Sequence, residues 1–151
     1  MLQFKEKQPP EQVIIKFPFA DYAAKFWMTF AAVSEDESQE LLDLIEQFFC
    51  FQKIPYIVCY APYRPDQPWL EYKDIQEQGI PGSPLYYAAS GNLQSTVRVL
   101  LKKNADVDAK GGYYGNALKA ASAVGHEQMV KLLLEKSADV NAQCGFYGNA
   151  L

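Results

Sequence analysis

The chain has 151 residues, 49% of them hydrophobic and 21% charged, and its formal net charge is −4. This balance is typical of a soluble globular chain with one folding unit or two small ones, and the lack of a basic block argues against a nucleic-acid binder. The sequence shows no signal peptide and no apolar run near the ~18 residues of a membrane span. Three cysteines without C-x-x-C spacing favour a reducing compartment, so we expect a cytoplasmic protein, with the nucleus as the alternative.

The first predicted helix follows a polar lead-in, residues 1–16, which contains Pro9-Pro10 and is expected to be extended. Pro18 suits the first turn of a helix. One face at i, i+3, i+4 spacing is then apolar and is made by Phe19, Tyr22, Ala23, Phe26, Trp27 and Phe30. Because burial of each large apolar side chain contributes roughly 1.5–3 kcal/mol, we expect this aromatic face to be packed.

A second helix is predicted to begin at Ser34, which has capping-box spacing to Glu37, with Ser38 as an alternative N-cap. The acids at 35–37 favour the positive end of the helix dipole, and we expect them to be solvated there. The apolar stripe of this helix consists of Leu41, Leu42, Leu44, Ile45, Phe48 and Phe49.

Residues 54–61 are apolar on both sides, and their periodicity fits a short buried helix or a strand. We choose a helix because the neighbouring elements are helical. Residues 62–68 contain P-x-x-P twice, which could bind an SH3-like groove. A rigid connector anchored by Trp69 is the better interpretation, because such spacing often arises by chance. We therefore divide this half into a helical cap, 17–69, and a linker, 70–81.

The rest of the chain repeats with a period of 33 residues. Residues 82–114 and 115–147 share 13 identities, and a third copy begins at 148–151, so residues 82–151 are predicted to be a stacked repeat array. Ser83 and Asn116 are suitable N-caps for a first helix in each copy, which ends near Gly91-Asn92 or Gly125. A second helix carries an apolar triplet at i, i+3, i+4: Val97, Leu100 and Leu101, or Val130, Leu133 and Leu134.

These copies resemble the ankyrin repeat, a unit of 33 residues built as helix, turn, helix and loop. Residues 83–109 read S-P-L-Y-Y-A-A-S-G-N-L-Q-S-T-V-R-V-L-L-K-K-N-A-D-V-D-A, and residues 116–142 match the same pattern. The chain departs from it at Asn116-Ala117, which replaces Thr-Pro, and at Asn104 and Ser137, which replace a glycine. The resemblance implies an all-α fold: a helical solenoid of ankyrin repeats with an N-terminal helical cap.

The sequence motif Tyr-Gly-Asn-Ala-Leu also resembles the ankyrin arrays of filamentous-fungal NACHT-type receptor proteins. A weaker resemblance covers residues 18–69 and rests on Phe26-Trp27-Met28, Phe48-Phe49 and the segment 63–69. It implies that this part caps the array, because the end of a solenoid otherwise exposes its stacking face.

The sequence offers little for catalysis. His126 is the only histidine, and it occupies the repeat's Gly-His position before the second helix, which favours a structural role. A metal site needs three or four converging ligands, and no phosphate-binding glycine motif occurs. We therefore predict a non-catalytic protein-interaction module without cofactor or metal. The alternative is an enzyme or enzyme accessory domain with its site in the N-terminal half.

By resemblance, the loops between repeats form the fingers through which ankyrin proteins contact partners. The predicted partner-binding residues are Lys110, Gly112, Tyr113, Gln143 and Phe146 on the loops, with Tyr87, Ser90 and Ala123 on the concave side. Aromatic residues on glycine-rich turns supply contact area at low entropic cost. The matching pair Tyr114 and Tyr147 is expected to space the loops instead.

The last predicted feature is an uncovered end formed by Leu118, Ala121, Val130 and Leu133. From it we expect a fragment of a longer protein that either associates end to end or is marginally stable.

Overall fold

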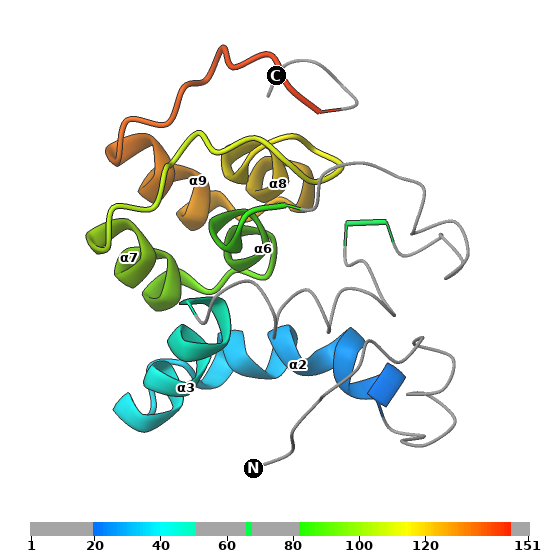
Figure 1. Ribbon diagram of the computed structural model, residues 1–151, viewed down its shortest axis with the longest axis vertical. Helices are drawn as coiled ribbons and strands as arrows, with labels where there is room; N and C mark the ends of the chain where they lie inside the picture. The colour runs from blue at the N-terminus through cyan, green and yellow to red at the C-terminus, as the bar shows by residue number, and fades with distance from the viewer. Residues whose placement is uncertain (1–19, 51–65, 68–81, 146–151) are drawn as a thin grey trace, which may run out of the picture.

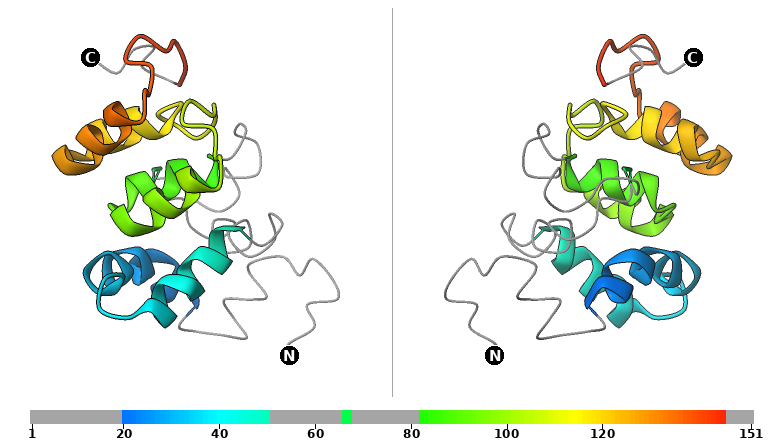
Figure 2. Two further views of the ribbon diagram at one scale, coloured as in Figure 1. Left: turned by 90° about the vertical axis from the view of Figure 1, so that its left-hand side faces the viewer. Right: turned by 90° about the vertical axis from the view of Figure 1, so that its right-hand side faces the viewer.

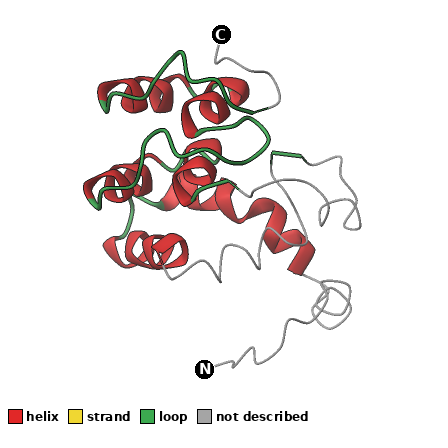
Figure 3. Cartoon of the chain, turned by 45° about the horizontal axis from the view of Figure 1, so that its top comes forward, coloured by secondary structure: helices red, strands yellow, loops and turns green. Residues whose placement is uncertain are grey.

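The computed structural model describes residues 20–50, 66–67 and 82–145. In these residues the chain forms six helices: α2 (Ala20–Ser34), α3 (Gln39–Cys50), α6 (Pro84–Ser90), α7 (Gln94–Lys102), α8 (Ala117–Val124) and α9 (Glu127–Glu135). Everything else within the described ranges is turn or loop, with no strand (Figure 3). The all-α prediction is therefore confirmed.

The helices are arranged in three stacked pairs (Figures 1 and 2). The pair α2–α3 lies at one end, α6–α7 in the middle and α8–α9 at the other end. The repeats bury three of their six predicted apolar positions in one continuous core: Val97 and Leu100 in the first repeat and Leu133 in the second. Leu101 and Val130 are half-buried, and Leu134 is exposed, contrary to the prediction. Ala88 and Ala121 are fully buried, and their small side chains allow the first helices of successive repeats to approach closely.

The ends predicted for the first helix of each repeat are confirmed by side-chain and backbone geometry. The Ser83 Oγ accepts a hydrogen bond from the Tyr86 N–H at 3.1 Å, and the Asn116 Oδ1 accepts one from the Lys119 N–H at 2.9 Å. Gly125 ends α8 in the left-handed conformation with φ 80°. Its equivalent one repeat earlier is Asn92, with φ 59°, rather than Gly91. Asparagine tolerates this conformation through its short polar side chain.

Helix α2 packs with a different face from the one predicted. Met28 and Ala31 are buried, and Trp27 is half-buried with its ring 4.6 Å from that of Phe48. The predicted face is exposed at Tyr22, Ala23, Phe26 and Phe30, while Phe19 lies outside the described residues. The aromatic spacing identified a real stripe, but both sides of α2 are apolar. The core takes the side with Ala31 and the flexible Met28, which lies against Gly91.

The start of the second helix also differs from the prediction. Helix α2 continues through Ser34, and α3 begins after Ser38. The Leu41 N–H donates a hydrogen bond to the Ser38 Oγ at 3.4 Å. The alternative cap is therefore the one used. Within the predicted stripe, Ile45 and Phe49 are buried, Leu41, Leu42 and Phe48 are half-buried, and Leu44 is exposed.

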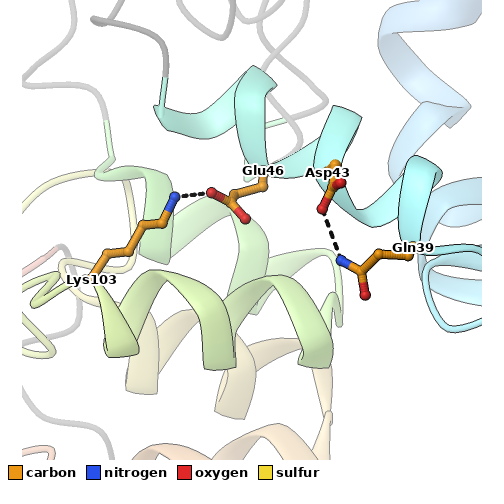
Figure 4. Close-up of polar contacts among 4 residues, drawn as sticks. All are labelled: Gln39, Asp43, Glu46 and Lys103. Carbon is orange, nitrogen blue, oxygen red and sulfur yellow. Dashed lines mark hydrogen bonds and ion pairs between the residues drawn. The ribbon is translucent and has the colours of Figure 1, made fainter.

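Glu35 is buried rather than solvated, because it joins the first helix pair to the repeats. Its Oε1 accepts the Ser95 N–H at 2.9 Å, and its Oε2 accepts the Thr96 N–H at 3.1 Å and the Thr96 hydroxyl at 2.9 Å. These backbone N–H groups belong to the first turn of α7, where they have no partner within the helix. The N-cap residue of α7 supplies no side-chain acceptor, so Glu35 takes that place. A second link, farther along α3, is the ion pair between Glu46 and Lys103, and Gln39 and Asp43 bond on the same helix (Figure 4).

Several predicted features lie outside the described residues: the lead-in 1–16, Pro18, the helix at 54–61, Trp69, the linker 70–81, Tyr147 and the copy beginning at 148–151. His126 lies between the repeats, with its Nε2 3.0 Å from the Ser90 carbonyl oxygen. This contact is consistent with the structural role predicted for the histidine.

Candidate protein-interaction surface

The first finger is the turn between α7 and α8, residues 110–115. It closes on itself through the Gly111 N–H, which donates to the Gly115 carbonyl at 2.9 Å. Tyr86 supports it from below, with its ring between Gly82 and Gly112. A Cβ on Gly112 would lie 2.3 Å from the Tyr86 Cζ, and the φ of this residue is 72°. Gly112 thus allows the turn to lie directly on the tyrosine ring.

A buried carboxylate holds the same finger. The Tyr86 hydroxyl donates to the Asp66 Oδ2 at 2.7 Å, and the Tyr113 N–H donates to the same oxygen at 2.9 Å. The Tyr86 oxygen in turn accepts the Tyr114 N–H at 3.2 Å. Burial, and the nearby Asp66 charge, raise the pKa of the Tyr86 phenol well above its usual value. The phenol therefore remains a hydrogen-bond donor at neutral pH.

The second finger, of which the structure describes residues 143–145, lies against the first through backbone contact. A Cβ on Gly115 would lie 2.4 Å from the Gly145 nitrogen, and one on Gly145 would lie 2.1 Å from the Tyr114 carbonyl oxygen. Lys119 occupies the position that Tyr86 has one repeat earlier, and its Nζ donates to the Cys144 carbonyl at 2.5 Å. Glycine at both positions therefore permits the two turns to stack.

The structure places the predicted partner-binding residues in four groups: exposed, half-buried, buried, and outside the described residues. Lys110, Gln143 and Ala123 are exposed, and Tyr113 is half-buried with its ring 5.3 Å from that of Tyr114. Gly112 is half-buried beneath the turn. Phe146 lies outside the described residues.

Tyr87 and Ser90 do not belong to an exposed surface, contrary to the prediction. Tyr87 is fully buried, with its ring perpendicular to that of Tyr86 at 4.9 Å, and Ser90 is buried beside His126. Helix α6 has only seven residues, and every position from Leu85 to Ser90 is buried. The ankyrin pattern gave their position on the helix, but it did not show that this helix is enclosed on all sides.

The predicted uncovered end also needs correction. Leu118, Ala121 and Leu133 are buried and Val130 is half-buried, because these side chains face the core of their own helix pair. The exposed apolar side chains of this end are Val124, Leu134 and Val140.

The described residues contain no group of three or more His, Cys, Asp or Glu side chains placed to hold a metal ion. None of the described helices combines the length and apolar character needed to cross a bilayer. Cys144 is a free, half-buried thiol, whereas Cys59 and the side chain of Cys50 lie outside the described part. No observation favours the enzyme alternative.

Comparison with known proteins agrees with this geometry. Residues 32–144 match a family model described as ankyrin repeats, in three copies, so the match includes α3 as well as both repeats. The chain is also similar to the azaphilone pigments biosynthesis cluster protein L of Monascus ruber, with 36% identity over 123 residues. That alignment covers 75% of this chain and 26% of the relative, so the chain spans about a quarter of the relative's length. On the family match and the stacked helix pairs, the chain belongs to the ankyrin repeat family.

Proposed function

We propose that this chain is a non-catalytic protein-interaction module that binds another protein through its fingers. We call the set Lys110, Tyr113, Gln143 and Ala123 the finger surface. The observation that carries the proposal is that the fingers are held firmly from below while Lys110 and Gln143 remain exposed above. Turns fixed before binding lose little conformational entropy on binding, which favours affinity.

Tyr113 supplies the aromatic contact of this surface. Its backbone N–H donates a hydrogen bond to Asp66, which restricts the position of the residue, and its ring packs against the ring of Tyr114. A rigid, partly exposed tyrosine provides large contact area at little entropic cost, which is why such residues recur in binding hot spots. Lys110, on the same finger, and Gln143, one repeat later, add exposed polar groups.

The setting of this module is part of the same proposal. The chain would be a segment of a longer receptor-like or regulatory protein that acts in the cytoplasm or nucleus. Two observations support this reading: the motif Tyr-Gly-Asn-Ala-Leu resembles that of fungal NACHT-type receptor proteins, and the alignment covers 26% of the Monascus relative. The partner is another protein, not nucleic acid or membrane.

Affinity capture from a cell extract tests the finger surface. The intact chain is compared with a Lys110→Ala/Tyr113→Ala/Gln143→Ala variant and with a Lys102→Ala/Lys131→Ala control, which changes exposed residues on α7 and α9. We expect the finger variant to lose partners that the control retains, while circular dichroism shows the same helix content in all three. Retention of the same partners by the finger variant would show that the fingers are not the binding surface.

A further inference from the structure

Two hydrogen-bond donors of the first repeat converge on one carboxylate oxygen at the base of the first finger. The Tyr86 hydroxyl and the Tyr113 N–H donate to the Asp66 Oδ2 at 2.7 Å and 2.9 Å. We call these two groups the donor pair. Both belong to the repeat, whereas Asp66 lies 20 and 47 positions earlier in the sequence. A backbone N–H and a hydroxyl directed at one oxygen are groups with which proteins bind a carboxylate.

The donor pair is held in place by contacts within the repeat. The Tyr86 ring is fully buried, and Gly112 lies directly on it. The Tyr86 oxygen accepts the Tyr114 N–H at 3.2 Å, which directs the hydroxyl proton toward Asp66. The finger that carries the second donor closes through its own backbone hydrogen bond. Because these three contacts do not involve Asp66, we expect both donors to keep their positions when that carboxylate is absent.

The carboxylate that fills this place is buried but only partly bonded. Asp66 is 2% exposed, and Gln67, the next residue, is 5% exposed. The second carboxylate oxygen, Oδ1, is buried and meets no hydrogen-bond donor among the residues that the structure describes. A buried acceptor without a donor weakens the binding of the group that carries it. This imperfect fit favours exchange of Asp66 for another carboxylate whose second oxygen reaches solvent.

We propose that the base of the first finger is a binding site for the side-chain carboxylate of another protein, which this chain fills with its own Asp66. Asp66 is then an autoinhibitory ligand, because a partner that offers an aspartate or glutamate here must displace it. Tyr113 links this site to the finger surface, since its N–H belongs to the donor pair. In the second repeat, Lys119 takes the place of Tyr86 and reaches a backbone carbonyl instead. The choice of a protein as the source of the carboxylate rests on the proposed function, whereas the affinity of the donor pair for a carboxylate does not.

Formate tests the donor pair, because it is the group that Asp66→Ala removes. The full chain with this substitution is unfolded with urea in sodium formate and, as reference, in sodium chloride at equal concentration. A dissociation constant of about 0.1 M would raise the folding equilibrium constant roughly sixfold at about 0.5 M formate. Slow amide exchange at Tyr113 should return over the same concentration range. If the variant is unfolded in chloride, the titration is followed as recovery of the helical circular dichroism.

Two matched variants exclude a general effect of the salt. Asp66→Asn fills the site with a side chain of equal size, so it should gain no more from formate than the wild type does. Asp66→Ala/Tyr86→Phe lacks one donor and should gain less than Asp66→Ala. No gain in Asp66→Ala, or an equal gain in all the variants and the wild type, overturns the carboxylate site.

A peptide arm identifies the source of the carboxylate. The peptide has the sequence of residues 64–69, and its control has alanine in place of the aspartate. Both are added to Asp66→Ala/Gln67→Ala, which has lost two buried side chains of the resident ligand. We expect the aspartate peptide to slow amide exchange at Tyr113 at a concentration roughly tenfold below that of formate, because it adds contacts of its neighbouring residues. The control peptide should have no effect.

The outcomes separate this site from the finger surface. Binding of formate without binding of the aspartate peptide would indicate a site for small anions and overturn the assignment of a protein ligand. If both probes bind as expected while the affinity capture shows no loss of partners, the carboxylate site is supported and the finger surface is contradicted.

Discussion

The two repeats share a sequence pattern but are held in place by different chemistry. In the first repeat, the N-terminus of α7 is capped by Glu35 and the finger is held by Asp66, both from outside the repeat. In the second repeat, the N-cap residue of α9, His126, makes no side-chain cap, and Lys119 reaches a backbone carbonyl of the following turn. The shared pattern therefore builds the helix pairs, while residues specific to the first repeat attach the N-terminal half to them.

The largest effect is expected where the first finger lies on Tyr86. Gly112→Ala would combine a left-handed φ with overlap of the new methyl group on the tyrosine ring. We expect a loss of about 3 kcal/mol in the free energy of unfolding, measured by urea denaturation. Gly125→Ala is the matched control, because Gly125 is also left-handed but a Cβ there meets nothing within 4 Å. It should cost only about 1 kcal/mol, and equal losses would contradict this account of the finger.

The buried cap should rank second. Glu35→Ala leaves the Ser95 and Thr96 N–H groups and the Thr96 hydroxyl without their acceptor. Unpaired buried donors cost about 1–3 kcal/mol each, and partial access of water reduces the total, so we expect a loss of about 2–3 kcal/mol on thermal or urea unfolding. Glu37→Ala, at an exposed acid in the same turn, should change stability by about 0.5 kcal/mol or less. A Glu35 variant as stable as the Glu37 variant would show that the cap contributes nothing.

These two sites mark the limit of what the sequence could predict. The 33-residue period gave both helix pairs, and residue chemistry gave their caps at Ser83 and Asn116. Glu35 and Asp66 contact residues about 60 and 47 positions away, and such long-range pairs leave no periodic signal. The face of α2 was mispredicted for a related reason: when both sides of a helix are apolar, spacing identifies stripes but not which one the core receives.

A smaller effect is expected for Tyr86→Phe, which removes the hydroxyl bonded to Asp66. A hydrogen bond to a charged group contributes about 1.5–3 kcal/mol, and the Tyr113 N–H still serves the carboxylate, so we expect a loss of about 1.5 kcal/mol. Amide hydrogen exchange at Tyr113 and Tyr114 should accelerate. Tyr113→Phe is the control, because that residue reaches Asp66 through its backbone. If both substitutions destabilise the chain equally, the Tyr86 hydroxyl has no special role.

The same phenol predicts a pH dependence. Its pKa is raised in the folded chain above the ordinary value of 10.0, so the folded state retains the proton while the unfolded state releases it. The stability that this group contributes is fully present below about pH 10 and declines as the pH rises above it. Tyr86→Phe should show a smaller decline over that range, measured by urea unfolding at pH 9 and 11. Identical slopes in the two proteins would indicate that another group titrates.

The smallest effect is expected at the ion pair between α3 and α7. Lys103 is 55% exposed and Glu46 is 20% exposed, so solvent screens their attraction even though the pair spans two layers. Exposed ion pairs contribute about 0.2–1 kcal/mol, and Lys103→Ala should cost no more than that, less still at high salt. Lys102→Ala, at the neighbouring exposed lysine, should be nearly neutral. If Lys103→Ala cost as much as Glu35→Ala, then the ion pair would hold the first helix pair to the repeats as strongly as the buried cap does.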